Sequence, residues 1–257
     1  MDYLQHHLDS YFKVTGWSNS NNYSQLLDPV SKIISFPAPT GLSFQIGRSI
    51  TDQLKSSFTV GVVPSTQSVG YLFSSLPCTP NRELPSICKA IPYSGTFRPN
   101  YLMYGRMFQN GKLEGIYAHR VSPQSLLIAS GISAWVERPG LWSNMQFQFL
   151  HHRESNGLFC EASYSSDNQI SGINILKRIS KSWSIGTEAY YTNKETSGGL
   201  SVAIRYQNLF NAQEGAKEKH GDVFTFVANP IMGHYSLGVA TDLSNDLHVA
   251  TKYHHKY

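Results

Sequence analysis

The segment Leu200–Tyr206 constrains the fold most, because every second residue in it is apolar and the residues between are small or charged. A period of two is the geometry of a β-strand, whose successive side chains point to opposite faces of a sheet. Upstream, residues 183–191 repeat the pattern, with Trp183 and Tyr191 at the two ends of the apolar face. Aromatic ends around a shorter aliphatic middle are typical of a strand that crosses a bilayer. The pattern therefore predicts a transmembrane antiparallel β-barrel.

The composition agrees with this class of fold. Charged residues make up 15% of the chain, whereas soluble domains average about 25%. The net charge of +4 is too small and too evenly spread to predict nucleic-acid binding. No linker-like stretch divides the sequence, so we expect one barrel domain over residues 1–257.

The first 40 residues differ from the rest. In residues 1–15, apolar and aromatic side chains recur at spacings of one, three and four, which predicts an amphipathic helix that ends near Gly16. We expect this helix to pack inside the fold, because its polar face is poor in the Lys that favours a membrane surface. Residues 18–40 are rich in Asn, Ser and Pro and are predicted to be a connector, with the strands in residues 41–257. The helix face consists of Tyr3, Leu4, His7, Leu8, Tyr11 and Phe12.

Fourteen segments have the strand pattern, and most are about ten residues long, as tilted spanning strands of roughly 9 to 11 residues require. Two long connections, 76–99 and 208–221, are expected to carry contacts rather than fold information. The predicted strands are 41–50, 56–63, 67–75, 100–108, 112–120, 124–133, 142–150, 156–165, 169–177, 181–191, 198–207, 222–229, 233–241 and 246–254.

One hairpin carries a specific prediction about its two faces. In residues 181–207 we expect an antiparallel pair of strands, with Trp183, Ile185, Val202 and Ile204 toward lipid and Ser184, Glu188 and Arg205 toward the lumen. A shift of register by one residue would exchange the two sets.

The N-terminus gives an expectation about the compartment. Residues 1–11 contain no Lys or Arg, and the first Arg is Arg48, so neither a secretory signal nor a cleaved presequence is predicted. No window has the roughly 20 apolar residues of a spanning helix. Bacterial outer-membrane barrels carry a secretory signal, so either such a signal has been removed from this sequence or the barrel is expected in the outer membrane of mitochondria or plastids.

The sequence predicts no enzyme, cofactor site or metal site. It contains no nucleophile elbow, phosphate loop or zinc-binding helix motif. Histidines occur as adjacent pairs at residues 6–7, 151–152 and 254–255, and neighbours on a strand point to opposite faces, so a pair cannot chelate one ion. Cys78, Cys88 and Cys160 are expected to be free thiols, although a bridge between the first two is compatible with their spacing.

An ordered set of short motifs resembles the fungal mitochondrial distribution and morphology protein ten family, the barrel subunit of the ER–mitochondria encounter structure. The resemblance covers the whole chain, and the order of the motifs carries it rather than any one of them. The motifs are Thr15–Trp17, Asn21–Ser24, Phe36–Leu42, Gly70–Pro77, Tyr101–Phe108, Leu113–Tyr117, Arg120–Gln124, Tyr190–Tyr191 and Asn229–Ser236.

This resemblance implies a fold and two non-enzymatic roles. The fold is a barrel of the mitochondrial porin superfamily, with about nineteen strands and the N-terminal helix in the lumen. One role is to anchor the lipid-transfer and ER-embedded subunits of a tether complex to the mitochondrial outer membrane, in contact with membrane lipids, supporting phospholipid exchange and mitochondrial morphology. The other is to assist the barrel insertase of the sorting and assembly machinery late in the assembly of outer-membrane proteins.

The resemblance also implies a shortened C-terminus and a contact site. The family pattern continues through further strands beyond Tyr257, so we expect about fourteen strands here and no closing pair between residues 41–50 and 246–254. The family carries an aromatic pair where this sequence has Tyr71 and Phe73, and that pair is implicated in holding the tether partner. The alternative is that both belong to the lipid-facing aromatic belt. Tyr101 and Tyr104 should point to different faces and are weaker candidates.

Two other functions remain as alternatives. A solute or anion channel of the mitochondrial porin type needs a basic lumen, to which Arg48, Arg106, Arg205 and Lys252 could contribute. A soluble propeller would show blade-length repeats of about 40 residues, and the sequence shows none.

Overall fold

The computed structural model describes residues 8, 11, 12, 15, 17, 22–34, 42–51, 53–62, 66–75, 100–136, 140–208, 222–242 and 248–256. The fold is all-β, with fourteen strands at the positions where fourteen were predicted, and consistent with a β-barrel protein. Besides helical residues near the N-terminus, the helical elements in the described part of the chain are η1 (Tyr23–Gln25), α2 (Asp28–Ile34) and η2 (Glu154–Asn156). The strands are β1 (Ser43–Ser49), β2 (Leu54–Gly61), β3 (Thr66–Ser74), β4 (Asn100–Phe108), β5 (Leu113–Ser122), β6 (Ser125–Val136), β7 (Gly140–Arg153), β8 (Leu158–Ser165), β9 (Ile170–Arg178), β10 (Trp183–Thr192), β11 (Ser197–Gln207), β12 (Val223–Asn229), β13 (His234–Asp242) and β14 (His248–Lys256).

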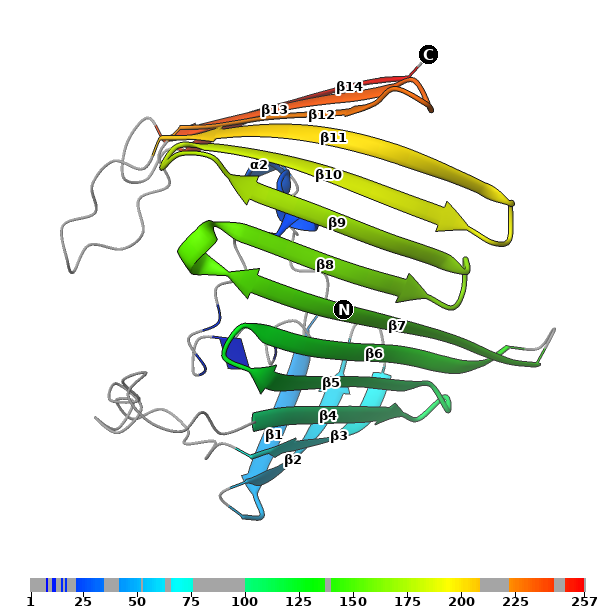
Figure 1. The fold of residues 1–257 in the computed structure, drawn as a ribbon. Helices are drawn as coiled ribbons and strands as arrows, with labels where there is room; N and C mark the ends of the chain where they lie inside the picture. The colour runs from blue at the N-terminus through cyan, green and yellow to red at the C-terminus, as the bar shows by residue number, and fades with distance from the viewer. Residues whose placement is uncertain are drawn as a thin grey trace. The chain divides into compact units, whose positions relative to one another are not determined.

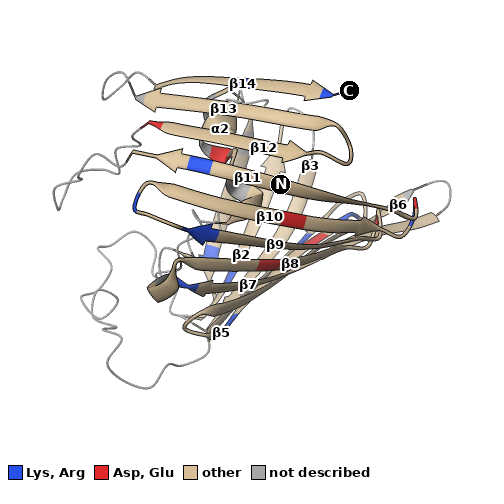
Figure 2. Cartoon of the chain, turned by 45° about the horizontal axis from the view of Figure 1, so that its top comes forward, with Lys and Arg blue, Asp and Glu red and all other residues tan. Residues whose placement is uncertain are grey.

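The chain divides into two compact units. Unit 1 comprises residues 1–18, 39–149 and 164–167, and unit 2 comprises residues 19–38, 150–163 and 168–257. Strands β1 to β6 and most of β7 belong to unit 1, whereas most of β8 and all of β9 to β14 belong to unit 2. Within each unit, consecutive strands lie side by side (Figure 1). Lys, Arg, Asp and Glu are sparse on these strands (Figure 2), as the low charged fraction requires.

In unit 1, strands β4 and β5 alternate between a buried and an outward face. On β4 and β5, Leu102, Tyr104, Ile116 and Ala118 are buried, and the residues between them are more exposed. The turn between these strands is tight because Gly111 adopts a φ of +79°, a conformation that costs glycine little. We call the face with Leu102 and Ala118 the covered face and the opposite one the outward face.

The helix predicted for residues 1–15 is present where the structure describes it. Leu8, Tyr11, Phe12 and Thr15 are helical, and the first three are buried. The Thr15 hydroxyl donates to the Tyr11 carbonyl at 2.8 Å, and the Trp17 N–H donates to the Phe12 carbonyl at 2.9 Å. The latter bond spans five residues and ends the helix, near the predicted Gly16. Tyr3, Leu4 and His7 lie outside the described residues.

In unit 2, the hairpin of β10 and β11 has the predicted pairing and faces. The two strands are antiparallel, with Ile185 opposite Ile204 and Glu188 opposite Ser201. Trp183, Ile185, Val202 and Ile204 are among the exposed large apolar residues, whereas Arg205 is 6% exposed. Ser184 and Glu188 are partly covered. The register inferred from the alternation is therefore confirmed.

Residues 22–34 are more ordered than the predicted connector. They contain η1 and α2, which contact β9 and β10, and β13 and β14, respectively. The sequence signal for α2 is Asp28–Pro29, because an acidic residue and a proline both favour the first turn of a helix. We call residues 22–34 the inner segment, and the connector prediction is wrong there. The single-domain expectation stays a prediction, as does the absence of a pair between β1 of unit 1 and β14 of unit 2.

Candidate partner-binding surface

Tyr71 and Phe73 lie on the outward face of β3. Their spacing of two places them on one side of the strand, as predicted, while Ser68, Gly70 and Ser74 are buried on the other side. Tyr71 is 55% exposed, and Phe73 is partly buried. The exposed ring of Tyr71 is therefore available to lipid or to a partner, and the ring of Phe73 is already packed on one side.

Phe73 is part of a larger aromatic cluster across β3, β4 and β5. Its ring lies 5.8 Å from the ring of Tyr101, which lies 6.2 Å from that of His119. The rings of Tyr117 and His119 are 5.9 Å apart, and the Tyr117 hydroxyl lies 2.9 Å from His119 Nδ1. We call Phe73, Tyr101, Tyr117 and His119 the aromatic cluster. Such pairs are rigid and bind through both apolar and polar atoms.

Sequence reasoning found part of this surface. Tyr101 and Tyr104 do face opposite sides, and Tyr104 is 2% exposed, so it belongs to the core. Tyr101, however, contacts Phe73 and lies in the cluster. Tyr117 and His119 were missed; their two-residue spacing on a predicted strand was visible, but only the register that pairs Tyr101 with His119 brings them together.

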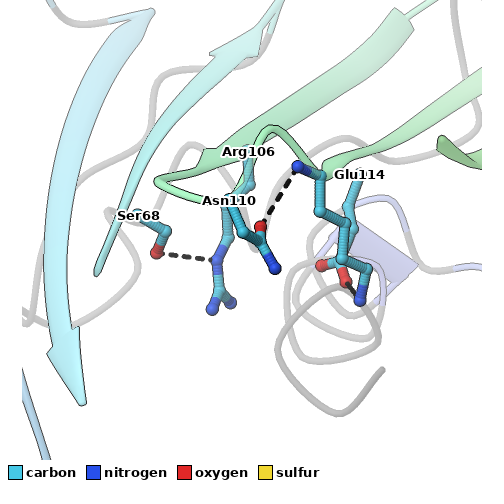
Figure 3. Close-up of polar contacts among 5 residues, drawn as sticks. Ser68, Arg106, Asn110 and Glu114 are labelled. Atoms are coloured by element: carbon cyan, nitrogen blue, oxygen red, sulfur yellow. Dashed lines mark hydrogen bonds and ion pairs between the residues drawn. The ribbon is translucent and has the colours of Figure 1, made fainter. Parts of the chain in front are cut away.

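The structure corrects one residue of the channel hypothesis. Arg48 is paired with Ser56, which is paired with Tyr71. Because residues paired across strands share a face, Arg48 lies on the outward face with Tyr71 and not on the face that would line a channel. Arg106 lies on the opposite, covered face, where its Nε donates to Ser68 Oγ at 2.9 Å (Figure 3). In unit 2, Arg205 is buried and Lys252 is exposed.

A small polar cluster lies around Arg106 at the β4–β5 turn. The Arg106 guanidinium lies 4.2 Å from the centroid of the Phe108 ring. Lys112 Nζ lies 5.2 Å from the same centroid. Lys112 Nζ lies 2.6 Å from a carboxylate oxygen of Glu114, and its backbone N–H donates to Asn110 Oδ1 at 3.2 Å (Figure 3). Glu114 offsets the cationic charge here, and the cluster holds the turn together.

The N-terminal helix is anchored to the covered face of unit 1 by two polar contacts. The Tyr11 hydroxyl donates to the Asn100 carbonyl at 3.0 Å, and Arg120 donates to the Thr15 carbonyl. The Arg120 guanidinium also lies 5.6 Å from the Trp17 ring. Burial raises the pKa of Tyr11 to about 12, so its phenol stays protonated and keeps donating. These contacts fix the end of the helix against β4 and β5.

The inner segment packs on the face of the unit 2 strands that carries Phe159, Leu176 and Ala203, which we call the covered face of unit 2. Buried and partly buried polar contacts hold it there. Asn22 Oδ1 lies 2.7 Å from His152 Nε2, and Ser24 Oγ donates to Glu161 Oε2 at 2.8 Å. Burial, and then the neighbouring carboxylate of Glu188, raise the pKa of the Tyr23 phenol. The Thr225 hydroxyl donates to the Leu26 carbonyl at 3.2 Å. Each of these bonds joins residues more than 100 positions apart, so the segment is specified by the tertiary fold.

Two glycines of the same face receive apolar side chains of the inner segment. A Cβ on Gly186 would lie 2.6 Å from Tyr23 Cδ2, and one on Gly238 would lie 2.9 Å from Leu27 Cδ2. Tyr23 and Leu26 also pack with Phe159, Leu176 and Ala203 in a buried cluster. The absence of side chains at Gly186 and Gly238 therefore lets the inner segment approach the sheet.

Other candidate chemistry is sparse. Cys160 is a free thiol, while Cys78 and Cys88 lie outside the described residues. His151 and His152 differ in burial as neighbours on a strand do. Within the ranges that the structure describes, no group of three or more His, Cys, Asp or Glu side chains is placed to hold a metal ion. Over the same ranges, no helix is long and apolar enough to span a membrane.

Comparisons with known proteins decide the family. The family model described as Mitochondrial distribution and morphology protein 10 matches residues 1–94 and 82–256. The chain belongs to this family. Similar relatives of that name occur in Postia placenta, 24% identical with 96% of this chain and 74% of the relative covered, and in Laccaria bicolor, 23% identical with 96% and 75% covered. A third, from Debaryomyces hansenii, is 27% identical over 92% of this chain and 56% of the relative.

Membership of the Mitochondrial distribution and morphology protein 10 family supports a mitochondrial protein with a role in mitochondrial distribution and morphology. This is a morphology family and not a known enzyme family. Membership of this family agrees with the all-β fold and with the resemblance that the ordered motifs show.

Proposed function

We propose that this protein is a non-enzymatic β-barrel of the mitochondrial outer membrane that anchors a tether between ER and mitochondria. Its partners are the lipid-transfer and ER-embedded subunits of the tether, through which phospholipids are exchanged. In a second role it assists the barrel insertase of the sorting and assembly machinery in late assembly of other outer-membrane barrels. Membrane lipids contact the remaining outward face.

The observation that supports an anchoring role is the exposed Tyr71 beside the aromatic cluster. Tyr71 is 55% exposed, while Phe73 is backed by Tyr101 at 5.8 Å. Interface hot spots are enriched in rigid aromatic residues that lose little conformational entropy on binding. The strand register adds Tyr101, Tyr117 and His119 to the two predicted residues, so the surface extends over three adjacent strands.

The test is recovery of the tether subunits with a variant in which Tyr71 and Phe73 are both replaced by alanine. We expect the loss of about 2 kcal/mol or more of binding free energy, which corresponds to a fall in affinity of roughly thirtyfold. Quantitative co-purification from mitochondria measures it.

The matched control is the double replacement of Phe147 and Phe149 by alanine. These two rings also alternate on one strand, and each is 44% exposed, so they lose similar apolar area. Recovery of the tether subunits should stay unchanged in the control. If both double variants recover the same amount of the tether subunits, Tyr71 and Phe73 belong to the lipid-facing aromatic belt. If the Tyr71 and Phe73 variant is lost from the membrane, the role of these residues is structural.

An anion channel is the second candidate function, because Arg106 lies on the covered face of unit 1 near Lys112. Against it, Arg48 faces outward and Arg205 is 6% exposed. Conductance of the purified protein in planar bilayers separates the two functions. A channel should give robust anion-selective currents, whereas an anchor should give small currents that do not change when Arg106 is replaced by glutamine.

A further inference from the structure

On the described strands of unit 1, the outward face combines apolar side chains with one cation, Arg48. Arg48 is exposed, and the pairing places it in one cross-strand row with Ser56 and Tyr71. A charged residue on the lipid-facing side of a spanning strand costs free energy, about 2–4 kcal/mol for Arg at the bilayer midplane and less near the headgroups. Arg48 is the penultimate residue of β1, so it lies near the end of the strand, where this cost is small.

On the outward face of the described strands β1 to β7, no side chain is acidic. Among the residues of strands β1 to β7, the acidic one is Glu114, which is 9% exposed and lies on the covered face beside Lys112. An acidic group that approaches Arg48 from outside therefore meets no like charge from these strands.

Tyr71 is left clear of neighbouring side chains on the side away from Arg48. The residue paired with it on β4 is Gly105, which is paired with Gly115 on β5. A Cβ on Gly105 would meet nothing within 4 Å. The ring of Tyr71 is thus flanked by Ser56 on one strand and by bare backbone on the other, which explains its exposure and allows close approach.

We infer that the surface formed by Arg48, Tyr71 and the aromatic cluster receives an apolar protein segment that carries a carboxylate for Arg48. The inference rests on the proposed function, because it specifies the chemistry of the partner at that same surface. Arg48 and an acidic side chain would fix the orientation of the segment, since complementary charges act mainly on specificity and approach. Tyr71 and Phe73 supply the apolar contact.

A protein segment fits this surface better than a phospholipid does. The row from Arg48 to Gly105 runs across the strands, and spanning strands tilt by about 35–45° from the bilayer normal. Because the row runs across strands with this tilt, it lies roughly 45–55° from the normal. The acyl chains of a bilayer lie along the normal on average. A helix or extended peptide has no such constraint. An anionic headgroup at Arg48 is the competing occupant that the experiment must detect.

The experiment places a photoreactive side chain at Met103 of the full chain in mitochondria. Met103 is 52% exposed and is paired with Phe73 and Tyr117, so it lies in the middle of the surface. We expect a crosslink to a tether subunit, with the crosslinked peptide containing Asp or Glu. Arg48→Glu should reduce this crosslink about tenfold or more, whereas Arg48→Lys should keep it within about twofold. Gly105→Leu, which fills the space beside Tyr71, should also reduce it.

Two control variants isolate charge and bulk. Arg153→Glu reverses an exposed charge at the end of β7. Ala189→Leu places a leucine at an exposed position of β10 and adds three carbons, against four in Gly105→Leu. Neither control should change the crosslink. A crosslink to phospholipid alone, or a protein crosslink that Arg48→Glu leaves intact, overturns the inference. If Arg48→Glu has no effect while the double alanine variant of Tyr71 and Phe73 loses the partner, the inference fails and the proposed function stands. If neither variant has an effect, both fail.

Discussion

Glycines in the middle of strands have opposite surroundings on the covered face of unit 2 and on the outward face of unit 1. A Cβ on Gly186 would lie 2.6 Å from a ring carbon of Tyr23 and 3.0 Å from the Ile175 carbonyl oxygen, whereas one on Gly105 would meet nothing within 4 Å. Glycine weakens a strand wherever it occurs, because it has no side chain to pack and loses more entropy on folding. In unit 2, the chain's own inner segment occupies the space that this leaves.

Glycine therefore serves two purposes in this protein. At Gly186 the missing side chain makes room for Tyr23, and the contact is internal and permanent. At Gly105 the space remains open on the surface next to Tyr71, so an external partner can use it. Substitutions should therefore affect stability at the first site and binding at the second.

The largest effect is expected for Tyr23→Ala. Tyr23 is 6% exposed and packs with Leu26, Leu176 and Ala203, so its removal leaves a cavity. We expect a loss of about 3 kcal/mol or more in the free energy of unfolding. Urea unfolding in detergent micelles measures it, and hydrogen exchange of residues 22–34 should rise at the same time. Tyr71→Ala, on the exposed side, should cost less than about 0.5 kcal/mol; similar losses in both variants would contradict the comparison.

Gly186→Val should follow, with a loss of about 1–3 kcal/mol from overpacking. The backbone oxygen of Ile175 cannot move aside, and the Tyr23 ring can only do so by leaving its site. The same unfolding measurement applies. If Tyr23→Ala in the background of Gly186→Val restores part of the loss, the two residues compete for one space. Full additivity would show that the glycine acts through the backbone instead.

A smaller coupling is expected between Asn22 and His152. Their side chains are 2.7 Å apart and buried, so a double-mutant cycle with Asn22→Ala and His152→Ala should give about 0.5–1.5 kcal/mol. The cycle is read from urea midpoints in micelles. A coupling of zero would mean that the inner segment is held by its apolar contacts alone.

The smallest change in stability is expected for Gly105→Val. With open space around the position and a β-branched side chain added to a strand, the free energy of unfolding should change by less than about 0.5 kcal/mol or rise slightly. Thermal unfolding in micelles would show it. A loss as large as that of Gly186→Val would remove the distinction between the two glycines.

The sequence predicted local structure well because alternation depends only on neighbouring residues. All fourteen strands are where period two placed them, and the faces of Ile185, Val202 and Arg205 follow from the same alternation. The connector prediction failed at residues 28–34, where a short helix has too few residues to show a period. That helix is stabilised by its packing against β13 and β14, which local propensity does not contain.

The candidate surface shows the same limit. The shared face of Tyr71 and Phe73 follows from their spacing, but Tyr117 and His119 join them only through the pairing of β4 with β5. Arg48 was assigned to the lining because it is basic, and the register with Ser56 and Tyr71 places it outside instead. Registers depend on which residues meet across strands, and the composition of one strand does not fix that.

The all-β class, the number and approximate positions of the strands, the alternation of faces along the β10–β11 hairpin and the family follow from the sequence alone. These properties come from period-two alternation and from motif order, both of which are written along the chain. The tertiary structure was needed to show that Tyr23 fills the space at Gly186, that Asn22 meets His152, and that Arg48 shares a surface with Tyr71. Contacts between residues far apart in sequence depend on strand register and packing, because a one-residue shift would send a strand residue such as His152 or Arg48 to the other face.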